Sequence, residues 1–353
     1  MATLKVIQVA TGAVGTHSLR AILGHKDLEL AGLLVFSPDK VGRDAGELVG
    51  APAVGIRATD NFDEILATEA DAVSFNALGD TLDPAAAFDQ ICRLLESGKN
   101  VCSTALSALV YPPITDRHAM DQRLQAACRK GGVSFHGTGI NPGFMMDVWP
   151  IVLGRLVRHI DTLYMTEMVD MSRYTSNQVL TVLGYGKRPD EMSFELPFEH
   201  ARESAYFGSI LMLAEAAGLE IDDATLTWEG FASDKAIVTP AIEVEPGHVG
   251  AVRVRVRAFK NTRMRVESQM LWMLGKDAAP ADWPYGDGSW SVRIEGDPSL
   301  ETRIDASTSF DAKQPDVLMT GAHGVNAIPA VVKGPVGVLT HLDLPLFTGT
   351  FSA

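Results

Sequence analysis

The sequence has few cysteines and no long apolar run, and these shortages exclude several classes of protein. Its 353 residues include three cysteines, Cys92, Cys102 and Cys128, which lack the spacing of a metal site. We interpret them as small core residues of a protein in a reducing compartment. No apolar run approaches the ~18 residues that span a bilayer, and no signal peptide precedes the first strand. These absences predict a cytoplasmic protein with no bound metal and no membrane partner.

Positive charge is also scarce. The sequence has 30 Lys and Arg residues and 44 Asp and Glu residues, which gives a formal net charge of −14. A chain this acidic repels nucleic acid, so we expect none as a partner. Residues 251–258 alternate valines with Arg253, Arg255 and Arg257, which is typical of an antiparallel strand with one buried face. We interpret the arginine row as a solvated or subunit-contact face.

A glycine-containing turn follows the first strand pattern. It reads Ala10-x-Gly12-x-x-Gly15, a dinucleotide-binding fingerprint with alanine in the first place. Gly12 lets the backbone approach a pyrophosphate, Gly15 lets the helix pack closely on the strand, and the helix N-terminus favours phosphate. We predict a nucleotide site here rather than an ordinary tight connection. The expected cofactor contacts are Ala10, Thr11, Gly12, Ala13, Val14 and Gly15.

The first 140 residues alternate strands with helices, which predicts a parallel, doubly wound sheet. Such sheets bind ligands at the carboxyl ends of their strands, and we assign Asn76, Ala77, Ser103 and Thr104 to the cofactor site. The predicted strands are Lys5–Val9, Leu28–Phe36, Ala72–Asn76, Asn100–Ser103 and Val133–His136. The predicted helices are Thr16–Leu23, Asn61–Ala67, Pro84–Ser97 and Asp116–Lys130.

The end of the second strand bears on the choice of cofactor. An enzyme selective for NAD carries an acidic residue there, which accepts from the ribose 2′-hydroxyl and repels a 2′-phosphate. This sequence has Ser37, followed by Lys40 and Arg43, whose donors and charge suit a phosphate. We favour NADP and keep NAD as the alternative, because Asp39 lies close by and a solvated loop has the same composition.

After residue 140 the pattern changes to that of an α+β domain, with helices covering one face of a mixed or antiparallel sheet. Residues 137–144 form a glycine-rich loop, in which we expect Asn141 to contact the cofactor and Phe144 to wall the nicotinamide pocket. The predicted elements are helices at Met146–Leu156, Tyr206–Ala217 and Asp316–Val332, strands at Thr162–Met171 and Ala251–Ala258, a loop at Asp277–Gly288 and an apolar closing segment at Val336–Leu344.

Several stretches spread over nearly the whole chain carry a resemblance to a known family. They are Lys40 to Asp44, Gly98 to Ala105, Gly137 to Phe144, Asn326 to Pro329 and Leu342 to Pro345. The sequence resembles 2,4-diaminopentanoate dehydrogenase and the native amine dehydrogenases of the dihydrodipicolinate reductase-like group. It lacks the His-His-x-x-Lys signature of true dihydrodipicolinate reductase.

The resemblance implies a Rossmann domain for the cofactor, an α+β domain for the substrate and the homodimer contacts, and a last segment that packs back on the first domain. We accordingly place the domains at residues 1–145, 146–315 and 316–353. The family interconverts an amine and a carbonyl through an imine, moving hydride to or from nicotinamide. The expected cofactor is therefore NADP or NAD, and the expected partner is a small ketone, imine or amine.

One catalytic residue of the family is missing. Relatives carry a glutamate directly after the Ser-Thr-Ala stretch, whereas here residues 106–111 follow it and no carboxylate precedes Asp116. The resemblance places Leu106, Ser107, Phe144 and Val169 in the substrate pocket.

Two glutamates and a tyrosine are the remaining candidates for proton chemistry. Where amino-acid-binding relatives carry Arg and Asn, this sequence has Glu167 and Val169; Tyr174 is retained, and Glu203 falls at a histidine of relatives. Burial beside Val169 and Phe207 would raise the pKa of a glutamate and keep part of it protonated, so that it could act as a general acid. An ionised glutamate would instead attract an ammonium or iminium. Tyr174 is the alternative donor, and the two glutamates could also be surface acids.

We expect an oxidoreductase, and three hypotheses remain open. The first is an amine dehydrogenase-like imine or carbonyl reductase, and the second is an alcohol/ketone oxidoreductase that never handles nitrogen. The third is a nucleotide-binding protein without turnover.

Overall fold

The computed structural model describes residues 3–79, 83–111, 118–286, 288–308 and 314–350. Contacts within the chain divide it into two compact units. The first comprises Met1–Gly143 and Val317–Ala353, and the second comprises Phe144–Asp316. None of the described helices is long and apolar enough to cross a membrane.

The first unit is built on a six-stranded sheet in the order β15-β5-β4-β3-β1-β2, in which every neighbouring pair is parallel. Its strands are β1 (Leu4–Val9), β2 (Leu28–Leu34), β3 (Ala72–Phe75), β4 (Asn100–Ser103), β5 (Ser134–Gly137) and β15 (Gly337–Leu339). Its helices are α1 (Ala13–Gly24), α2 (Ala45–Leu48), α3 (Phe62–Ala67), α4 (Pro84–Glu96), α5 (His118–Gly131) and α11 (Pro315–Lys333), with short 3-10 turns η1 (Pro38–Lys40) and η2 (Ser107–Leu109).

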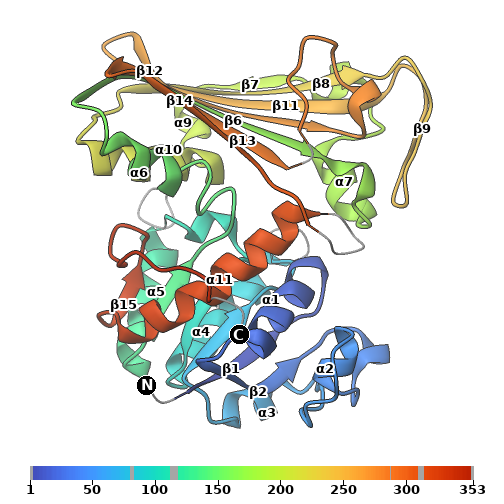
Figure 1. Cartoon of the computed structure of the whole chain (residues 1–353), viewed down its shortest axis with the longest axis vertical. Coiled ribbons are helices and arrows are strands. Elements are labelled where there is room, and N and C mark those ends of the chain that lie inside the picture. The colour runs from blue at the N-terminus through green and yellow to red at the C-terminus, as the bar shows by residue number, and fades with distance from the viewer. Residues whose placement is uncertain (1–2, 80–82, 112–117, 287, 309–313, 351–353) are drawn as a thin grey trace. The chain divides into compact units, whose positions relative to one another are not determined.

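The strand order reverses at β1, which lies between β2 and β3 (Figure 1). In doubly wound sheets this switch point opens the crevice where ligands bind. The predicted α/β Rossmann fold is confirmed. The predicted helix starting at Asp116 begins at His118, and Asp116 itself lies outside the described residues.

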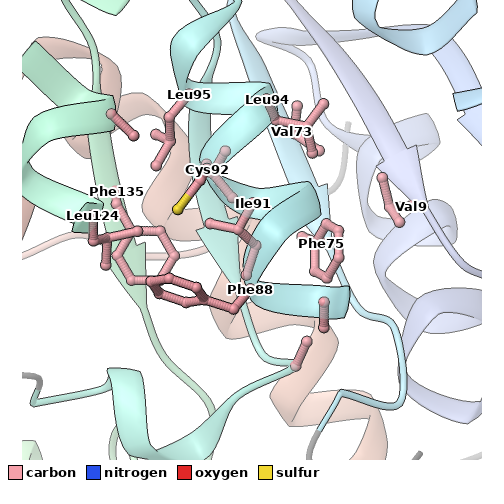
Figure 2. Close-up of a cluster of buried hydrophobic side chains, with 14 of the residues drawn as sticks. Val9, Val73, Phe75, Phe88, Ile91, Cys92, Leu94, Leu95, Leu124 and Phe135 are labelled. Carbon is pink, nitrogen blue, oxygen red and sulfur yellow. The ribbon is translucent and has the colours of Figure 1, made fainter. Parts of the chain in front are cut away.

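Buried apolar side chains from the strands and from α4 form a core of this unit (Figure 2). Phe75 on β3 and Phe135 on β5 are fully buried, and Ile91 of α4 is as well. Cys92 belongs to the same cluster, and burial raises the pKa of its thiol to about 11. All three cysteines are buried and free, as expected for small core residues.

The second unit contains a seven-stranded mixed sheet in the order β14-β13-β6-β12-β11-β8-β7, with β6 and β12 as its parallel pair. Its strands are β6 (His159–Asp170), β7 (Phe194–Leu196), β8 (Asp223–Ala232), β11 (Val249–Lys260), β12 (Arg263–Met273), β13 (Ser289–Asp297) and β14 (Leu300–Asp305), beside a small pair β9 (Ile237–Val238) and β10 (Glu243–Val244). Its helices are α6 (Val148–Gly154), α7 (Asn177–Leu183), α8 (Pro189–Met192), α9 (Phe198–Ala201) and α10 (Ala205–Ala217), with 3-10 turns η4 (Met171–Arg173) and η5 (Lys276–Ala278).

The two faces of this sheet differ in polarity. Val252, Val254 and Val256 of β11 are fully buried on one face, and Figure 1 shows α6, α9 and α10 on one side of the sheet. The arginines that alternate with these valines point to the opposite face. The expected α+β domain with a mixed sheet is therefore confirmed. Its predicted strand at Thr162–Met171 ends one residue earlier, because Met171 starts η4.

Candidate active site

The turn between β1 and α1 has the shape that a dinucleotide fingerprint requires. A Cβ atom added to Gly15 would lie 2.2 Å from the carbonyl oxygen of Ala10, so only glycine fits there. A Cβ added to Gly12 would meet nothing within 4 Å, so the turn is open above this residue. Ala10 has a φ of 72°, a left-handed conformation that explains why glycine is usual at this first place. No acidic residue lies in the first turn of α1 to oppose a phosphate.

The loop after β2 is tied to this turn by Lys40. Its Nζ donates to the carbonyl oxygen of Thr11 at 3.0 Å and to Thr11 Oγ1 at 3.1 Å. Ser37 and Arg43 are exposed on the same loop, and so is Asp39. The ammonium group of Lys40 therefore adds positive charge beside the N-terminus of α1.

The loop is anchored by Asp44, whose carboxylate accepts from the backbone nitrogens of Gly46, Val54 and Gly55 at 2.8 to 3.0 Å. Backbone hydrogen bonds, that from Val54 first, hold the pKa of Asp44 below its usual value. Asp44 thus keeps its charge while ordering the segment that carries Lys40 and Arg43.

A buried hydrogen-bond network joins the carboxyl ends of β1, β3 and β4. Gln8 Nε2 donates to the carbonyl oxygen of Ala10 and to Asn76 Oδ1, both at 2.8 Å. Asn76 Nδ2 in turn donates to Thr104 Oγ1 at 2.8 Å. The sequence-based assignment missed Gln8, although a glutamine inside a buried strand directly before the turn was the available signal.

The loop after β5 is tightly folded. Gly143 has a φ of 128°, and a Cβ atom there would lie 2.2 Å from the backbone nitrogen of Gly139. The backbone nitrogen of Thr138 donates to the carbonyl oxygen of Ser103 at 2.9 Å, which joins this loop to the end of β4. Asn141 Nδ2 is buried and has no hydrogen-bond partner in the part of the chain that the structure describes. It is a donor available to a ligand.

The first unit thus collects the predicted cofactor residues along one edge of a parallel sheet. These residues are Ala10, Thr11, Gly12, Ala13, Val14, Gly15, Ser37, Lys40, Arg43, Asn76, Ala77, Ser103, Thr104 and Asn141. The open glycine, the free end of α1 and the buried amide of Asn141 fit the phosphates and the amide of a nicotinamide dinucleotide. Of the predicted pocket residues, Leu106 is buried and Ser107 opens η2 in the same unit.

In the second unit, Glu167 lies on the apolar face of the sheet and is 5% exposed. Trp272 Nε1 donates to its Oε1 and Trp290 Nε1 donates to its Oε2, each at 2.8 Å. The indole N–H is a donor only, so both oxygens of Glu167 accept a hydrogen bond. Of the two alternatives left open for Glu167, a buried residue or a surface acid, the structure shows the buried one, and its two tryptophan partners were missed.

Further aromatic rings pack beside Trp272. The ring of Trp272 lies 6.1 Å from the rings of Tyr206 and Trp228, measured between centroids. Trp228 Nε1 is buried without a hydrogen-bond partner among the described residues. We call Glu167 with Trp272, Trp290, Trp228 and Tyr206 the acid–aromatic cluster.

Tyr174 belongs to the surroundings of the same carboxylate. Its hydroxyl donates to Asp316 Oδ2. Burial, followed by the charge of Asp316, raises the pKa of Tyr174 well above 10, and the charge of Glu167 acts in the same direction. Tyr174 therefore stays protonated at neutral pH. Asp316 was not among the predicted site residues.

Glu203 differs from Glu167 in its exposure. It is exposed in the turn before α10, whereas Phe207, one turn further on, is fully buried. The turn is set by Ser204, whose side chain caps α10 by accepting from the backbone nitrogen of Tyr206. Glu203 is therefore a surface acid, which is one of the two alternatives left open for it. Val169 is buried two residues from Glu167, and Phe144 is half-buried at the start of this unit.

The fold and the fingerprint turn together define a dinucleotide-binding domain of the Rossmann class. Comparison with known families matches residues 144–352 to the 2,4-diaminopentanoate dehydrogenase C-terminal domain. The chain is 33% identical over 347 residues to an amine dehydrogenase of Streptomyces virginiae, covering 95% of this chain and 94% of the relative. It is 23% identical over 358 residues to the 2,4-diaminopentanoate dehydrogenase of Acetoanaerobium sticklandii, covering 98% and 94%.

Among solved structures, the amine dehydrogenase of Mycobacterium smegmatis matches the fold with a TM-score of 0.78 at 22% identity, over 98% of this chain and 97% of that one. The chain belongs to the 2,4-diaminopentanoate dehydrogenase and amine dehydrogenase family, which confirms the resemblance inferred from its motifs. It is an oxidoreductase of the amine dehydrogenase type.

Proposed function

We propose that this protein interconverts an amine and a ketone through an imine, by hydride transfer to or from NADP. The observation that carries the proposal is the carboxylate of Glu167, buried on an apolar sheet face with both oxygens accepting from indole N–H groups. In this proposal Glu167 is ionised, and a buried anion beside two indole rings attracts an ammonium or iminium better than a neutral carbonyl. The name of the Streptomyces virginiae relative supports the same chemistry.

The proton chemistry follows from the same cluster. Reduction of an iminium needs no proton donor, because the substrate already carries the charge that hydride neutralises. Reduction of a carbonyl leaves an alkoxide that must be protonated. Because Glu167 is ionised in this proposal, Tyr174 is the protonated group that we assign to proton transfer, with Asp316 as the acceptor of its hydrogen bond. Residues 106–111 contain no carboxylate that replaces the family's glutamate.

Turnover with and without ammonia tests the proposal. The purified protein is given NADPH and a panel of small ketones, and cofactor oxidation is followed by absorbance. Turnover that requires ammonia supports amine dehydrogenation. Turnover that ignores ammonia indicates a carbonyl reductase without nitrogen chemistry, and cofactor binding without turnover indicates a nucleotide-binding protein.

Cofactor selectivity gives a specific prediction. We propose NADP over NAD because Ser37 leaves the ribose 2′ position free of a carboxylate and Lys40 and Arg43 lie on the same loop. Ser37→Asp should reverse the preference, since a carboxylate repels the 2′-phosphate and accepts from a free 2′-hydroxyl. The dissociation constants of NADP⁺ and NAD⁺ are measured for both proteins. An unchanged ratio in the variant would show that this loop does not contact the ribose.

A homodimer through the polar face of the second unit's sheet completes the proposal. On this face Arg253 forms a two-point ion pair with Glu229 at 2.8 Å, and Arg257 pairs with Glu267 at 2.6 Å. Arg255 lies between them, with a side chain only 16% exposed and an Nε atom that has no hydrogen-bond partner among the described residues. Light scattering should give twice the chain mass, and a stable monomer mass would end the dimer claim.

A further inference from the structure

Three histidines of the first unit gather at the end of β5, and we call them the imidazole cluster. His136 lies on β5 and is fully buried, His323 lies on α11, and His341 follows β15. The ring of His341 meets that of His136 edge-on at 4.5 Å between centroids and stacks on that of His323 at 5.4 Å. Phe347 stacks on His323 at 5.3 Å. Within the described ranges no group of acidic, cysteine and histidine side chains is placed to hold a metal ion, this cluster included.

Two of the imidazoles hold the ends of the Thr138–Gly143 loop. His341 Nε2 shares a hydrogen bond with Thr138 Oγ1 at 3.0 Å, at the start of the loop. His323 makes a hydrogen bond to the backbone of Gly143, at its end. Between these two points lies Asn141, whose buried amide nitrogen is available to a ligand. The position of that amide therefore depends on the two histidines.

The third imidazole links the cluster to the closing segment of the chain. His136 Nδ1 lies 2.9 Å from the carbonyl oxygen of Leu339, and because a carbonyl only accepts, Nδ1 carries the hydrogen. Its Nε2 is then the bare acceptor, and it has no partner in the part of the chain that the structure describes. A proton added to Nε2 of His136 would therefore have no hydrogen-bond acceptor among the described residues.

All three imidazoles are neutral at pH 7. Burial lowers the pKa of His136 and of His323 to about 4, and burial with the neighbouring imidazoles lowers the pKa of His341 well below 6.5. The charge of Asp343 partly opposes this at His136. Because the folded pKa values lie below the unfolded value of about 6.5, the neutral cluster stabilises the fold above that pH, and the stabilisation is lost as pH falls toward 4.

We propose that His323 and His341 are positioning residues of the cofactor site: they fix the Thr138–Gly143 loop and so make cofactor affinity fall in acid. The inference rests on the proposed cofactor site. It goes beyond that site because it makes the site's geometry depend on the closing segment of the chain. Protonation of two of these imidazoles places like charges at close range. Their repulsion pushes the rings apart and releases the loop that carries Asn141. A release of this kind changes binding before it unfolds the unit.

The test compares three variants by thermal unfolding and by NADP⁺ binding between pH 8 and 4, a range that reaches the pKa of about 4 of His136 and His323. Thr138→Val removes the hydroxyl that His341 contacts and should weaken NADP⁺ about 5- to 10-fold at pH 7.5, the scale of one hydrogen bond. His341→Gln keeps a hydrogen-bonding group at Nε2 but cannot take up a proton, so its affinity should fall less in acid than that of the wild type. Ser134→Ala is the matched control, since it removes the 2.8 Å hydrogen bond from Ser134 Oγ to the carbonyl oxygen of Pro335, on the same strand but away from the loop.

Ser134→Ala should lower the unfolding temperature and leave NADP⁺ affinity at the wild-type value. Equal losses of affinity in Ser134→Ala and Thr138→Val would show that only stability is involved and would overturn the inference. Wild-type affinity in Thr138→Val, or a pH dependence unchanged in His341→Gln, would also overturn it. A wild-type protein that binds neither NADP⁺ nor NAD⁺ at pH 7.5 would instead remove the proposed cofactor site and this inference with it.

Discussion

Glu167→Gln should lower turnover of amine or imine by about 10² or more, the scale on which preorganised charge contributes to catalysis. Glutamine has the shape of glutamate but no charge. Its amide also turns a donor toward one of the two indole N–H groups, so one hydrogen bond to Trp272 or Trp290 is lost. The proposed cofactor residues belong to the other unit, so the dissociation constant of NADP⁺ should stay at the wild-type value. Turnover is measured with saturating NADPH over a pH series.

Glu267→Gln is the matched control for this variant. Glu267 lies on β12, the strand next to β6 in the same sheet, and its side chain is 16% exposed. It belongs to the polar face and pairs with Arg257. This control should lose stability and keep its turnover. The Glu167→Gln variant is also assayed with ketones in the absence of ammonia. If this reduction is slowed by the same factor as turnover of amine or imine, Glu167 acts as a proton donor and not through its charge. If it turns over at the wild-type rate at every pH, Tyr174 or a water carries the chemistry.

The elements of the first unit could be predicted because their signals are local. The strand before the fingerprint turn, the helix after it, and α4 from Pro84 to Glu96 each carry their own periodicity and their own start and stop residues. In the second unit only α6, β6, β11 and α10 were predicted. Strands such as β13 carry an alternating pattern, but a sheet's strand order and register depend on pairings across a hundred residues or more.

The same distinction separates the site residues that were predicted from those that were missed. Gly12 and Gly15 act through the backbone of one turn, so a pattern of six residues identifies them. Glu167 was a candidate because it aligns with a position where amino-acid-binding relatives carry a pocket residue, but its partners lie 105 and 123 residues further along the chain. Thr138 and His341 are 203 residues apart. Nothing in the local sequence around either residue indicates such a pairing.

Gly12→Ala and Gly15→Ala should give opposite results, although both change a glycine of one turn to alanine. Gly12 has a φ of −71°, which alanine adopts freely, and a Cβ atom there meets nothing within 4 Å. The unfolding temperature of Gly12→Ala should therefore match that of the wild type. In the proposed cofactor site the methyl group takes the space through which the pyrophosphate approaches the backbone, so NADP⁺ affinity should fall about 10- to 100-fold, or roughly 1–3 kcal/mol.

Gly15→Ala places its Cβ atom 2.2 Å from the carbonyl oxygen and 2.8 Å from the carbonyl carbon of Ala10. Backbone atoms cannot rotate away as a side chain does, so α1 must shift from β1 at a cost of about 1–3 kcal/mol of stability. Unfolding temperature and NADP⁺ affinity should then fall together. Calorimetry with and without NADP⁺ measures both quantities for each variant. Full affinity in Gly12→Ala would mean that no pyrophosphate lies over this turn, and a wild-type unfolding temperature in Gly15→Ala would contradict the close packing of α1 on β1.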